Sequence, residues 1–331
     1  MAKVGFLGTG AWGITLADLI AKNGHEVLLW GIEEDVLDSL EKGKGHPKFP
    51  AFPVSSALRV VRSLQEVVEE CDLFVECVTA KGFRPVLEKL FTLGGLDRPF
   101  IITSKGIEQE TGQLLAEVAL EYISSDLIGY MSGPTLAKEV MQGQPTAAVA
   151  AGKNPEMQEL VCRLFDSPTF CIETSFDIMG VALGGAMKNV IAIASGIAEG
   201  LGFGHNTKAM LIVRGLREMC RMAKLKGARD ETCYGLAGIG DLIVTGVSNL
   251  SRNFQFGRFL GEGVDIDEAR KKVGMVIEGE YTVLSAYRLG QKNHLDLPIT
   301  YAMYQVLYEG KNPREALLHL LEEREAAAEI Q

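Results

Sequence analysis

The sequence has no long uninterrupted apolar run, no paired-cysteine motif and no excess of positive charge. Its longest weakly charged stretch, residues 178–198, is interrupted by Lys188 and rich in glycine and alanine, so it falls short of a membrane span. The six cysteines include no C-x-x-C pair, which favours free thiols over a disulfide framework. The first residues run directly into a strand pattern instead of a signal peptide. We therefore expect a cytoplasmic protein without an integral membrane segment.

Charge and histidine spacing exclude two further classes of protein. A formal net charge of −10 argues against binding of nucleic acid or of an anionic membrane surface. The five histidines show no ligand spacing, so no metal site is predicted. An anionic substrate would therefore need a local positive site built from specific residues. At 331 residues the chain is long enough for two globular domains.

The pattern of apolar residues changes near residue 175. Before this point, short apolar runs alternate with helical patterns, which is typical of βαβ units and a mostly parallel sheet. After it, long helical patterns predominate and strand-like runs nearly vanish. The sequence therefore predicts an α/β domain over residues 1–175 and an all-α substrate and catalytic domain over residues 176–331. The predicted strands are Lys3–Leu7, Glu26–Trp30, Leu58–Val61, Leu73–Val78, Phe100–Thr103, Leu127–Met131, Ala147–Ala151 and Phe170–Glu173. The helices predicted after residue 175 are Ile178–Glu199, Thr207–Leu225, Asp267–Lys272, Tyr281–Lys292, Ile299–Tyr308 and Pro313–Glu325.

A glycine-rich turn, GTGAWG at residues 8–13, follows the first predicted strand and opens the first predicted helix. In a dinucleotide-binding turn, Gly8 would permit the tight bend, Gly10 the approach to the pyrophosphate, and Gly13 the close packing of helix on sheet. Free N–H groups at the helix N-terminus would hold the pyrophosphate. We interpret residues 1–175 as a Rossmann-like dinucleotide-binding domain in which these glycines and Ala11 contact NAD or NADP. The alternative is a glycine-rich turn without a ligand.

Acidic residues follow the second predicted strand, about 20 residues beyond the glycines. A carboxylate of Glu33 or Glu34 would accept hydrogen bonds from the adenosine ribose and repel the extra phosphate of NADP. No Arg, Lys or His stands at positions 31–35 to bind that phosphate. The alternative is that these carboxylates only favour a helix N-terminus. The pattern favours NAD.

Lys188 lies in an apolar helical run without a counter-ion one turn away in either direction. Such a lysine either extends to solvent or is buried for a purpose. Burial would lower the pKa of its ammonium group and suit it to proton transfer near neutral pH. Asn189, a second polar residue in the same run, favours the functional interpretation.

Two other segments carry charged side chains near glycines. Asp241 ends the glycine-punctuated turn GLAGIGD and would either orient Lys188 or cap the following helix. Lys105 follows a strand, at the carboxyl edge where ligands bind in such sheets, and the segment SGPT (132–135) ends the next strand in the same way. We therefore place Lys105 at the ligand-binding edge.

The segment Ser251-Arg252-Asn253 offers a hydroxyl, a guanidinium and an amide in sequence. These groups suit the three oxygens of a phosphate, and Arg252 would bind two of them in parallel. The alternative is a helix N-cap followed by a surface arginine.

Seven blocks of the sequence, in order, resemble the bacterial-type NAD(P)-dependent glycerol-3-phosphate dehydrogenases. The resemblance extends over essentially the whole chain and implies reduction of dihydroxyacetone phosphate to sn-glycerol 3-phosphate, the backbone precursor in glycerophospholipid and lipid metabolism. The blocks are GTGAWG (8–13), SKGIE (104–108), SGPTLAKEV (132–140), GGAMKNVIAIASGI (184–197), GLAGIGDLIVT (235–245), SRNFQFG (251–257) and VIEGEYT (276–282).

The resemblance also implies roles for single residues. Lys188 would be the proton acceptor for the hydroxyl at C2, with Asp241, Asn189 and Lys105 as further catalytic residues. Ile32 stands where many NADP-using relatives carry Arg or His, which again favours NAD. The implied substrate contacts are Lys105, Gly133, Thr135, Lys188, Asp241, Thr245, Ser251, Arg252 and Asn253. The implied cofactor contacts are Trp12, Lys105, Ala137, Arg252, Val276 and Glu278.

Two other functions remain open at this point. A reductase acting on a hydroxy acid or a ketopantoate-like substrate would place a carboxylate against Arg252. A non-catalytic dinucleotide sensor would be expected to lack Lys188 or Asp241, and both are present. The apolar faces of the C-terminal helices permit a homodimer without requiring one.

Overall fold

The computed structural model describes residues 1–47, 49 and 52–322. In this part of the chain, one sheet has the strand order β3-β2-β1-β4-β5-β6-β7-β8, and its neighbouring strands are parallel except for the antiparallel pair of β6 and β7. The mostly parallel sheet, followed by helices alone, confirms the predicted fold class. The strands are β1 (Lys3–Leu7), β2 (Glu26–Trp30), β3 (Leu58–Val61), β4 (Leu73–Glu76), β5 (Phe100–Ile102), β6 (Ile128–Ser132), β7 (Thr146–Gly152) and β8 (Phe170–Ser175).

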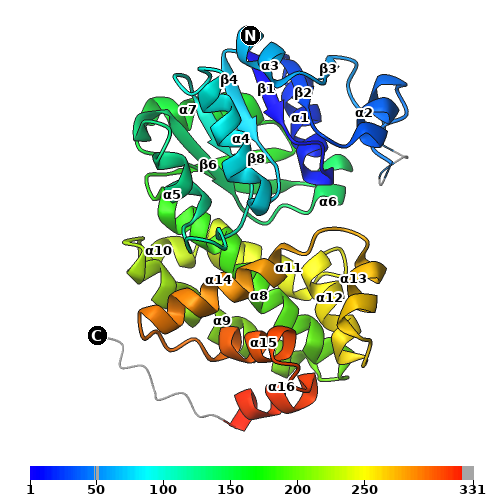
Figure 1. Cartoon of the computed structure of the whole chain (residues 1–331), viewed down its shortest axis with the longest axis vertical. Coiled ribbons are helices and arrows are strands. Elements are labelled where there is room, and N and C mark those ends of the chain that lie inside the picture. The colour runs from blue at the N-terminus through cyan, green and yellow to red at the C-terminus, as the bar shows by residue number, and fades with distance from the viewer. Residues whose placement is uncertain (48, 50–51, 323–331) are drawn as a thin grey trace.

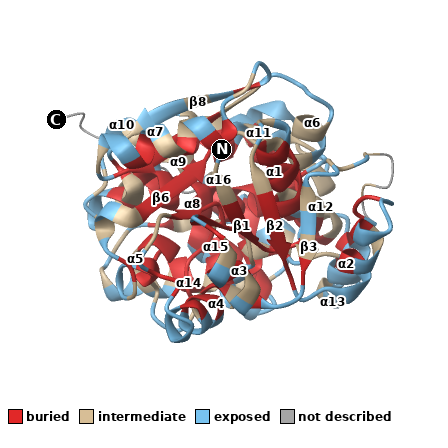
Figure 2. Ribbon diagram, turned by 90° about the horizontal axis from the view of Figure 1, so that it is seen from above, coloured by how far each residue is buried: buried red, intermediate tan, exposed pale blue. Residues whose placement is uncertain are grey.

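Helices cover both faces of the sheet, as Figure 2 shows from above. Apolar residues of α1 and α7 pack on one face, and those of α3, α4 and α5 pack on the other. Strands buried on both faces read as continuous apolar runs, which is why residues 26–30 were predicted as a strand. The chain runs from β1 to β2 and β3 on one side and then crosses to β4 on the other side of β1. In such sheets, ligands bind at the carboxyl ends of the strands where the order reverses. The helices of this domain are α1 (Ala11–Lys22), α2 (Glu34–Glu41), α3 (Leu64–Glu70), α4 (Ala80–Thr92), α5 (Leu115–Leu120), the 3₁₀ turn η1 (Ser125–Leu127), α6 (Ala137–Met141) and α7 (Pro155–Phe165).

The helical domain is built around α8 (Ile178–Gly200), which starts beneath the sheet and is surrounded by α9, α11, α12, α14 and α15 (Figure 1). The predicted helix over residues 313–325 agrees with α16 as far as Glu322, and its last three residues lie outside the described part of the chain. The other elements are α9 (His205–Leu225), α10 (Asp230–Cys233), the π-helical turn η2 (Leu236–Gly240), α11 (Asp241–Val247), α12 (Arg252–Gly261), α13 (Ile266–Val273), α14 (Glu278–Lys292), α15 (Pro298–Tyr308) and α16 (Pro313–Glu322).

Helices α8 and α12 cross on facing glycines. A Cβ added at Gly196 would lie 2.1 Å from the carbonyl oxygen of Phe254, and one at Gly257 would lie 2.1 Å from that of Ile193. No side chain larger than glycine's fits such a backbone contact. The contact fixes the start of α12, which carries Arg252, relative to Lys188 on α8.

Among the described helices, α8 alone is long and apolar enough to cross a membrane by itself, and the bent pair over residues 230–261 passes the same test taken together. Within α8, 89 % of the most apolar window is buried inside the protein. This burial is typical of a core helix.

Candidate active site

The glycine turn between β1 and α1 is closed against the protein on one side and open on the other. Gly8 has φ = +121°, and a Cβ there would lie 2.3 Å from the carbonyl oxygen of Cys77. A Cβ on Gly13 would lie 2.5 Å from the carbonyl oxygen of Gly8, whereas one on Gly10 meets nothing within 4 Å. Gly10 is also the N-cap of α1 and gives that helix no side-chain cap. The turn therefore has the open face and free N–H groups that a pyrophosphate requires.

The two candidate ribose ligands, Glu33 and Glu34, accept hydrogen bonds from different parts of the protein. Thr9, inside the glycine turn, donates its hydroxyl hydrogen to Glu33 Oε2 over 3.0 Å. Glu34 instead accepts a hydrogen bond from Nε of Arg62, also at 3.0 Å. Because only Glu33 is tied to the glycine turn, the geometry favours Glu33. Ile32 beside it is 79 % exposed.

Lys188, Asp241 and Lys105 form one buried ionic cluster at the junction of the two domains. Asp241 is 0 % exposed and Lys188 is 8 % exposed. The Lys188 ammonium donates to Asp241 Oδ1. The Lys105 ammonium donates to Asp241 Oδ2 at 2.7 Å and to the carbonyl oxygen of Gly133 at 3.2 Å. The sheet domain supplies Lys105 and the helical domain the other two, so the cluster exists only when the domains are packed together.

The charges of this cluster suit Lys188 to proton transfer. Burial lowers the pKa of Lys188, the Asp241 carboxylate opposes this effect and the neighbouring Lys105 ammonium adds to it, and the resulting pKa is about 7. A lysine with this pKa can donate or accept a proton near neutral pH. Two ammonium groups and one carboxylate also leave a local positive charge in a protein whose net charge is −10.

Two glycines on α8 make room for the cluster. A Cβ on Gly184 would lie 2.2 Å from the carbonyl oxygen of Ala237, in the turn that leads to Asp241. A Cβ on Gly185 would lie 3.1 Å from Cγ of Lys105. The pair of glycines preceding Lys188 therefore allows both partners to approach α8. In the sequence this pair was visible only as part of a small-residue run.

Asn189, predicted to be catalytic, contacts other helices instead of the ionic cluster. Its Oδ1 accepts a hydrogen bond from Nδ2 of Asn253 at 2.8 Å, and Oδ1 of Asn253 accepts one from the N–H of Gly279 at 2.9 Å. Among the described residues, no hydrogen bond joins Asn189 to Lys188 or Asp241. The two amides join α8, α12 and the start of α14.

The predicted phosphate ligands lie at the start of α12. The hydroxyl oxygen of Ser251 accepts the N–H of Phe254 at 3.3 Å, so Ser251 is the N-cap that the sequence left as an alternative. Arg252 is exposed and donates to the carbonyl oxygen of Val276 at 3.0 Å. Within the described part of the chain, no other hydrogen bond of the Arg252 guanidinium is present, so its remaining N–H groups are available to a ligand. In α11, the Thr245 hydroxyl lies 3.4 Å from Asp241 Oδ1.

The remaining predicted residues lie on several elements of both domains. Thr135 donates to the carbonyl oxygen of Gly133 at 3.1 Å. Ala137 begins α6, which packs on α1, the helix that carries Trp12. Glu278 begins α14 and accepts the N–H of Ala80 at the start of α4. Burial raises the pKa of Glu278 to about 7, and the positive charge of Arg252 opposes this rise. In the described residues no group of three or more His, Cys, Asp or Glu side chains is placed to hold a metal ion.

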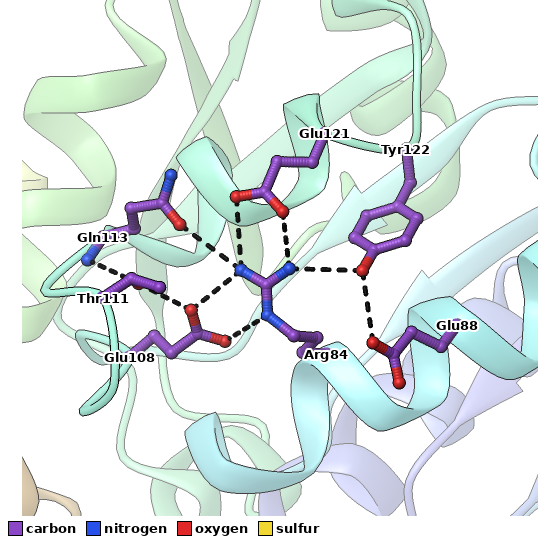
Figure 3. A network of polar contacts seen from close by, with 7 residues as sticks. All are labelled: Arg84, Glu88, Glu108, Thr111, Gln113, Glu121 and Tyr122. Atoms are coloured by element: carbon purple, nitrogen blue, oxygen red, sulfur yellow. Dashed lines mark hydrogen bonds and ion pairs between the residues drawn. The ribbon is translucent and has the colours of Figure 1, made fainter.

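A polar network centred on Arg84 of α4 was not predicted from the sequence (Figure 3). Arg84 donates from Nε and Nη2 to the two carboxylate oxygens of Glu108, at 2.7 and 2.8 Å, and from Nη1 to Glu121 at 2.5 Å. Thr111 donates to the same Glu108 carboxylate at 2.6 Å. The network therefore attaches the loop that carries Lys105 to α4. No motif marks it, because the partners are 24 and 37 residues apart.

An open glycine turn at the point of strand reversal, combined with a buried lysine of near-neutral pKa at the domain junction, is typical of a two-domain dinucleotide-dependent dehydrogenase. Comparisons with known proteins identify the family. Residues 3–158 match the model of the NAD-dependent glycerol-3-phosphate dehydrogenase N-terminus, and residues 177–318 match that of its C-terminus. The chain belongs to the NAD-dependent glycerol-3-phosphate dehydrogenase family, whose members use NAD(P).

Individual relatives agree over almost their whole length. The glycerol-3-phosphate dehydrogenase [NAD(P)+] of Chlamydia pneumoniae is 44 % identical over 322 residues, which is 96 % of each chain. That of Chlamydia trachomatis serovar D is 43 % identical over the same share of both chains. The crystal structure of glycerol-3-phosphate dehydrogenase from Coxiella burnetii superimposes with a TM-score of 0.92 at 34 % identity, covering 97 % of this chain and 99 % of that one.

Proposed function

We propose that the protein is a glycerol-3-phosphate dehydrogenase of the cytoplasm, which interconverts dihydroxyacetone phosphate and sn-glycerol 3-phosphate and feeds glycerophospholipid synthesis. The observation that carries the proposal is the buried cluster of Lys188, Asp241 and Lys105 at the carboxyl edge of the sheet. Relatives 44 % identical over nearly the whole chain, which carry this enzyme's name, support it.

The cofactor would be held mainly by backbone. Gly8, Gly10, Ala11, Trp12 and Gly13 would bind the pyrophosphate at the N-terminus of α1. Glu33 would accept hydrogen bonds from the ribose, and its negative charge favours NAD over NADP. The nicotinamide half would meet residues at the domain junction: Lys105, Ala137, Arg252, Val276 and Glu278. When bound, the nicotinamide supplies or accepts the hydride at C2 of the substrate.

Lys188 would transfer the proton that accompanies the hydride. In ketone reduction, its ammonium donates a proton to the oxygen on C2 and becomes a neutral amine. In alcohol oxidation, the amine takes the proton back from the C2 hydroxyl. Asp241 favours the charged form of Lys188, and Lys105 stabilises negative charge that develops on the oxygen. Asn189 would act as a positioning residue, because its amide is bonded to Asn253.

The substrate phosphate would lie at the start of α12. Arg252 suits two phosphate oxygens at once. Ser251 retains its hydroxyl hydrogen, since its oxygen only accepts the N–H of Phe254. Asn253 retains the second hydrogen of Nδ2, the first being donated to Asn189. Gly133, Thr135 and Thr245 would contact the rest of this small molecule.

We also propose that the chain divides into a cofactor domain at residues 1–175 and a substrate domain at residues 176–331, of which residues 323–331 lie outside the described part. In support, β8 ends at Ser175 and α8 begins at Ile178.

On α15, Tyr301 and Tyr308 are 44 % and 39 % exposed, which leaves an aromatic surface compatible with the homodimer considered from the sequence.

The proposal is tested by mixing purified protein with dihydroxyacetone phosphate and either NADH or NADPH, then following absorbance of the reduced cofactor. We expect oxidation of NADH, with NADPH less efficient. Unphosphorylated dihydroxyacetone and ketopantoate serve as controls, because neither presents a phosphate to Arg252. Turnover of either control at a rate comparable to that of the phosphorylated ketone would contradict the proposed substrate.

A further inference from the structure

Glu76, the last residue of β4, carries a completely buried carboxyl group that the proposed reaction does not use. Its Oε1 lies 2.6 Å from the backbone nitrogen of Val78 and 2.7 Å from the hydroxyl oxygen of Ser104. Its Oε2 is buried and has no hydrogen-bond partner among the described residues. Ser104 immediately precedes Lys105.

Counting hydrogens around Ser104 assigns a proton to Glu76. The Ser104 hydroxyl oxygen also lies 2.5 Å from the carbonyl oxygen of Val78. A carbonyl oxygen and a carboxylate oxygen only accept hydrogen bonds, and a serine hydroxyl has a single hydrogen to donate. Both short contacts are satisfied only if Ser104 donates to Val78 and accepts a hydrogen carried by Glu76.

The surroundings of Oε2 favour the same assignment. An unpaired oxygen of an ionised carboxylate is far more costly to bury than the carbonyl oxygen of a neutral acid. The titratable groups around Glu76 are the Cys77 thiol, which follows it in the chain, Tyr130 on β6 and Glu278 on α14. Two cations, Lys105 and Arg252, lie close enough to act on the Cys77 thiol. Among the described residues neither cation donates to Glu76, since Lys105 donates to Asp241 and Gly133, and Arg252 to Val276. The hydroxyl hydrogen of Tyr130 is donated to the carbonyl oxygen of Ser104 at 2.5 Å.

We propose that Glu76 is a neutral carboxylic acid in the folded protein and positions Lys105 through Ser104, a role that rests on the proposed function. Hydrogen bonds to the end of β4 fix the two residues before Lys105, Thr103 and Ser104. Thr103 donates its N–H and its hydroxyl to the carbonyl oxygen of Glu76, at 3.0 and 2.7 Å. If Glu76 ionises, Ser104 must serve two acceptors with one hydrogen, one short contact becomes repulsive, and Lys105 shifts relative to Asp241.

The first test measures the proton without measuring activity. Infrared difference spectra at pH 7 compare the wild type with Glu76→Gln and with the control Glu110→Gln, which changes an exposed glutamate on the loop that carries Lys105. We expect a carbonyl stretch of a protonated carboxylic acid that disappears in Glu76→Gln and persists in Glu110→Gln. A band of the wild type that Glu76→Gln leaves unchanged would show that Glu76 is ionised and overturn the proposal.

The second test measures positioning, as kcat/KM for oxidation of glycerol 3-phosphate against pH. Burial raises the pKa of Glu76 to about 8, so the wild-type value should decline above that pH. Glutamine cannot ionise, and its Nε2 can donate to Ser104, although that nitrogen cannot also accept the N–H of Val78 as Glu76 Oε1 does. Glu76→Gln should therefore lose the decline and retain more activity at pH 7 than Glu76→Ala. Glu76→Ala, which removes both groups, should reduce kcat/KM by ~10-fold or more.

Two outcomes of the second test separate the possible failures. A decline above pH 8 that is unchanged in folded Glu76→Gln would contradict the positioning role. Absence of activity in the wild type itself would refute the proposed function, while the infrared comparison would still decide whether Glu76 is protonated.

Discussion

Replacing Asp241 with asparagine would remove the one negative charge that lies between two ammonium groups while preserving the size of the side chain. Opposite unit charges 4 Å apart interact by about 4 kcal/mol at the effective dielectric constant of ~20 that describes protein sites. One pKa unit corresponds to about 1.4 kcal/mol, so the loss of Asp241 should lower the pKa of Lys188 by roughly 3 units. Since the starting value is about 7, Lys188 in the variant should titrate near pH 4.

The expected loss of kcat/KM is the same in the two directions of the reaction. At pH 7 the protonated fraction of Lys188 would fall from about one half to ~0.1 %, so kcat/KM for dihydroxyacetone phosphate reduction should fall by ~10²–10³-fold. The neutral amine needed for alcohol oxidation becomes more abundant but is a weaker base. Because the equilibrium constant fixes the ratio of the two kcat/KM values when cofactor binding is unchanged, kcat/KM for glycerol 3-phosphate oxidation should fall by the same factor. The assay is kcat/KM in both directions from pH 5 to 9.

Folding and cofactor binding provide the controls for Asp241→Asn. The variant should bind NADH within ~3-fold of the wild-type affinity, because among the described residues the Asp241 carboxylate bonds to Lys188, Lys105 and Thr245 and not to the glycine turn. A folded variant whose pH midpoint for reduction is unchanged would refute the reasoning, since Asp241 would then not set the pKa of Lys188.

Three further predictions concern other parts of the molecule. Glu33→Ala should raise the ratio of NADPH to NADH efficiency by ~10-fold, because the carboxylate that repels the extra phosphate is removed. Arg84→Met should leave the buried Glu108 carboxylate without its guanidinium, lowering the free energy of unfolding by roughly 2–4 kcal/mol and accelerating hydrogen exchange in residues 103–114. Because burial raises the pKa of Glu76, the folded state binds more protons than the unfolded state between about pH 4.3 and 8. Stability should therefore fall as pH rises through this window in the wild type, and fall less in Glu76→Gln.

Each of these predictions has a contrary outcome. An unchanged cofactor ratio would show that Glu33 does not face the ribose. Hydrogen exchange of the loop that stays at the wild-type rate in Arg84→Met would show that the Arg84 network does not hold it. Parallel stability curves for the wild type and Glu76→Gln would mean that Glu76 does not change its proton affinity on folding.

The sheet was predictable because its strands are continuous apolar runs, and β1, β2 and β3 begin and end at the predicted residues. The fourth strand was predicted to reach Val78 but ends at Glu76. There the side chain of Glu76 accepts the N–H of Val78, so the chain turns instead of continuing the ladder. A side chain that competes with the backbone in this way leaves no mark in an apolar pattern.

The site was predictable where a motif implies its own structural context. The glycine turn is such a case, because a strand and a helix flank it. The sequence could not decide whether Asp241 caps a helix or pairs with a lysine. Its partners Lys188 and Lys105 are 53 and 136 residues away in the chain. That Asn189 joins three helices was not predicted for the same reason, because this role depends on how α8, α12 and α14 pack.

Replacement of Lys188 with alanine tests the central claim most directly. Measured in both directions, turnover should fall by ~10³-fold or more, while the dissociation constant for NADH should stay within ~3-fold of the wild-type value. A small primary amine added to the assay should partly restore the rate. Substantial turnover without Lys188, or loss of cofactor binding together with turnover, would contradict its role as the group that carries the proton.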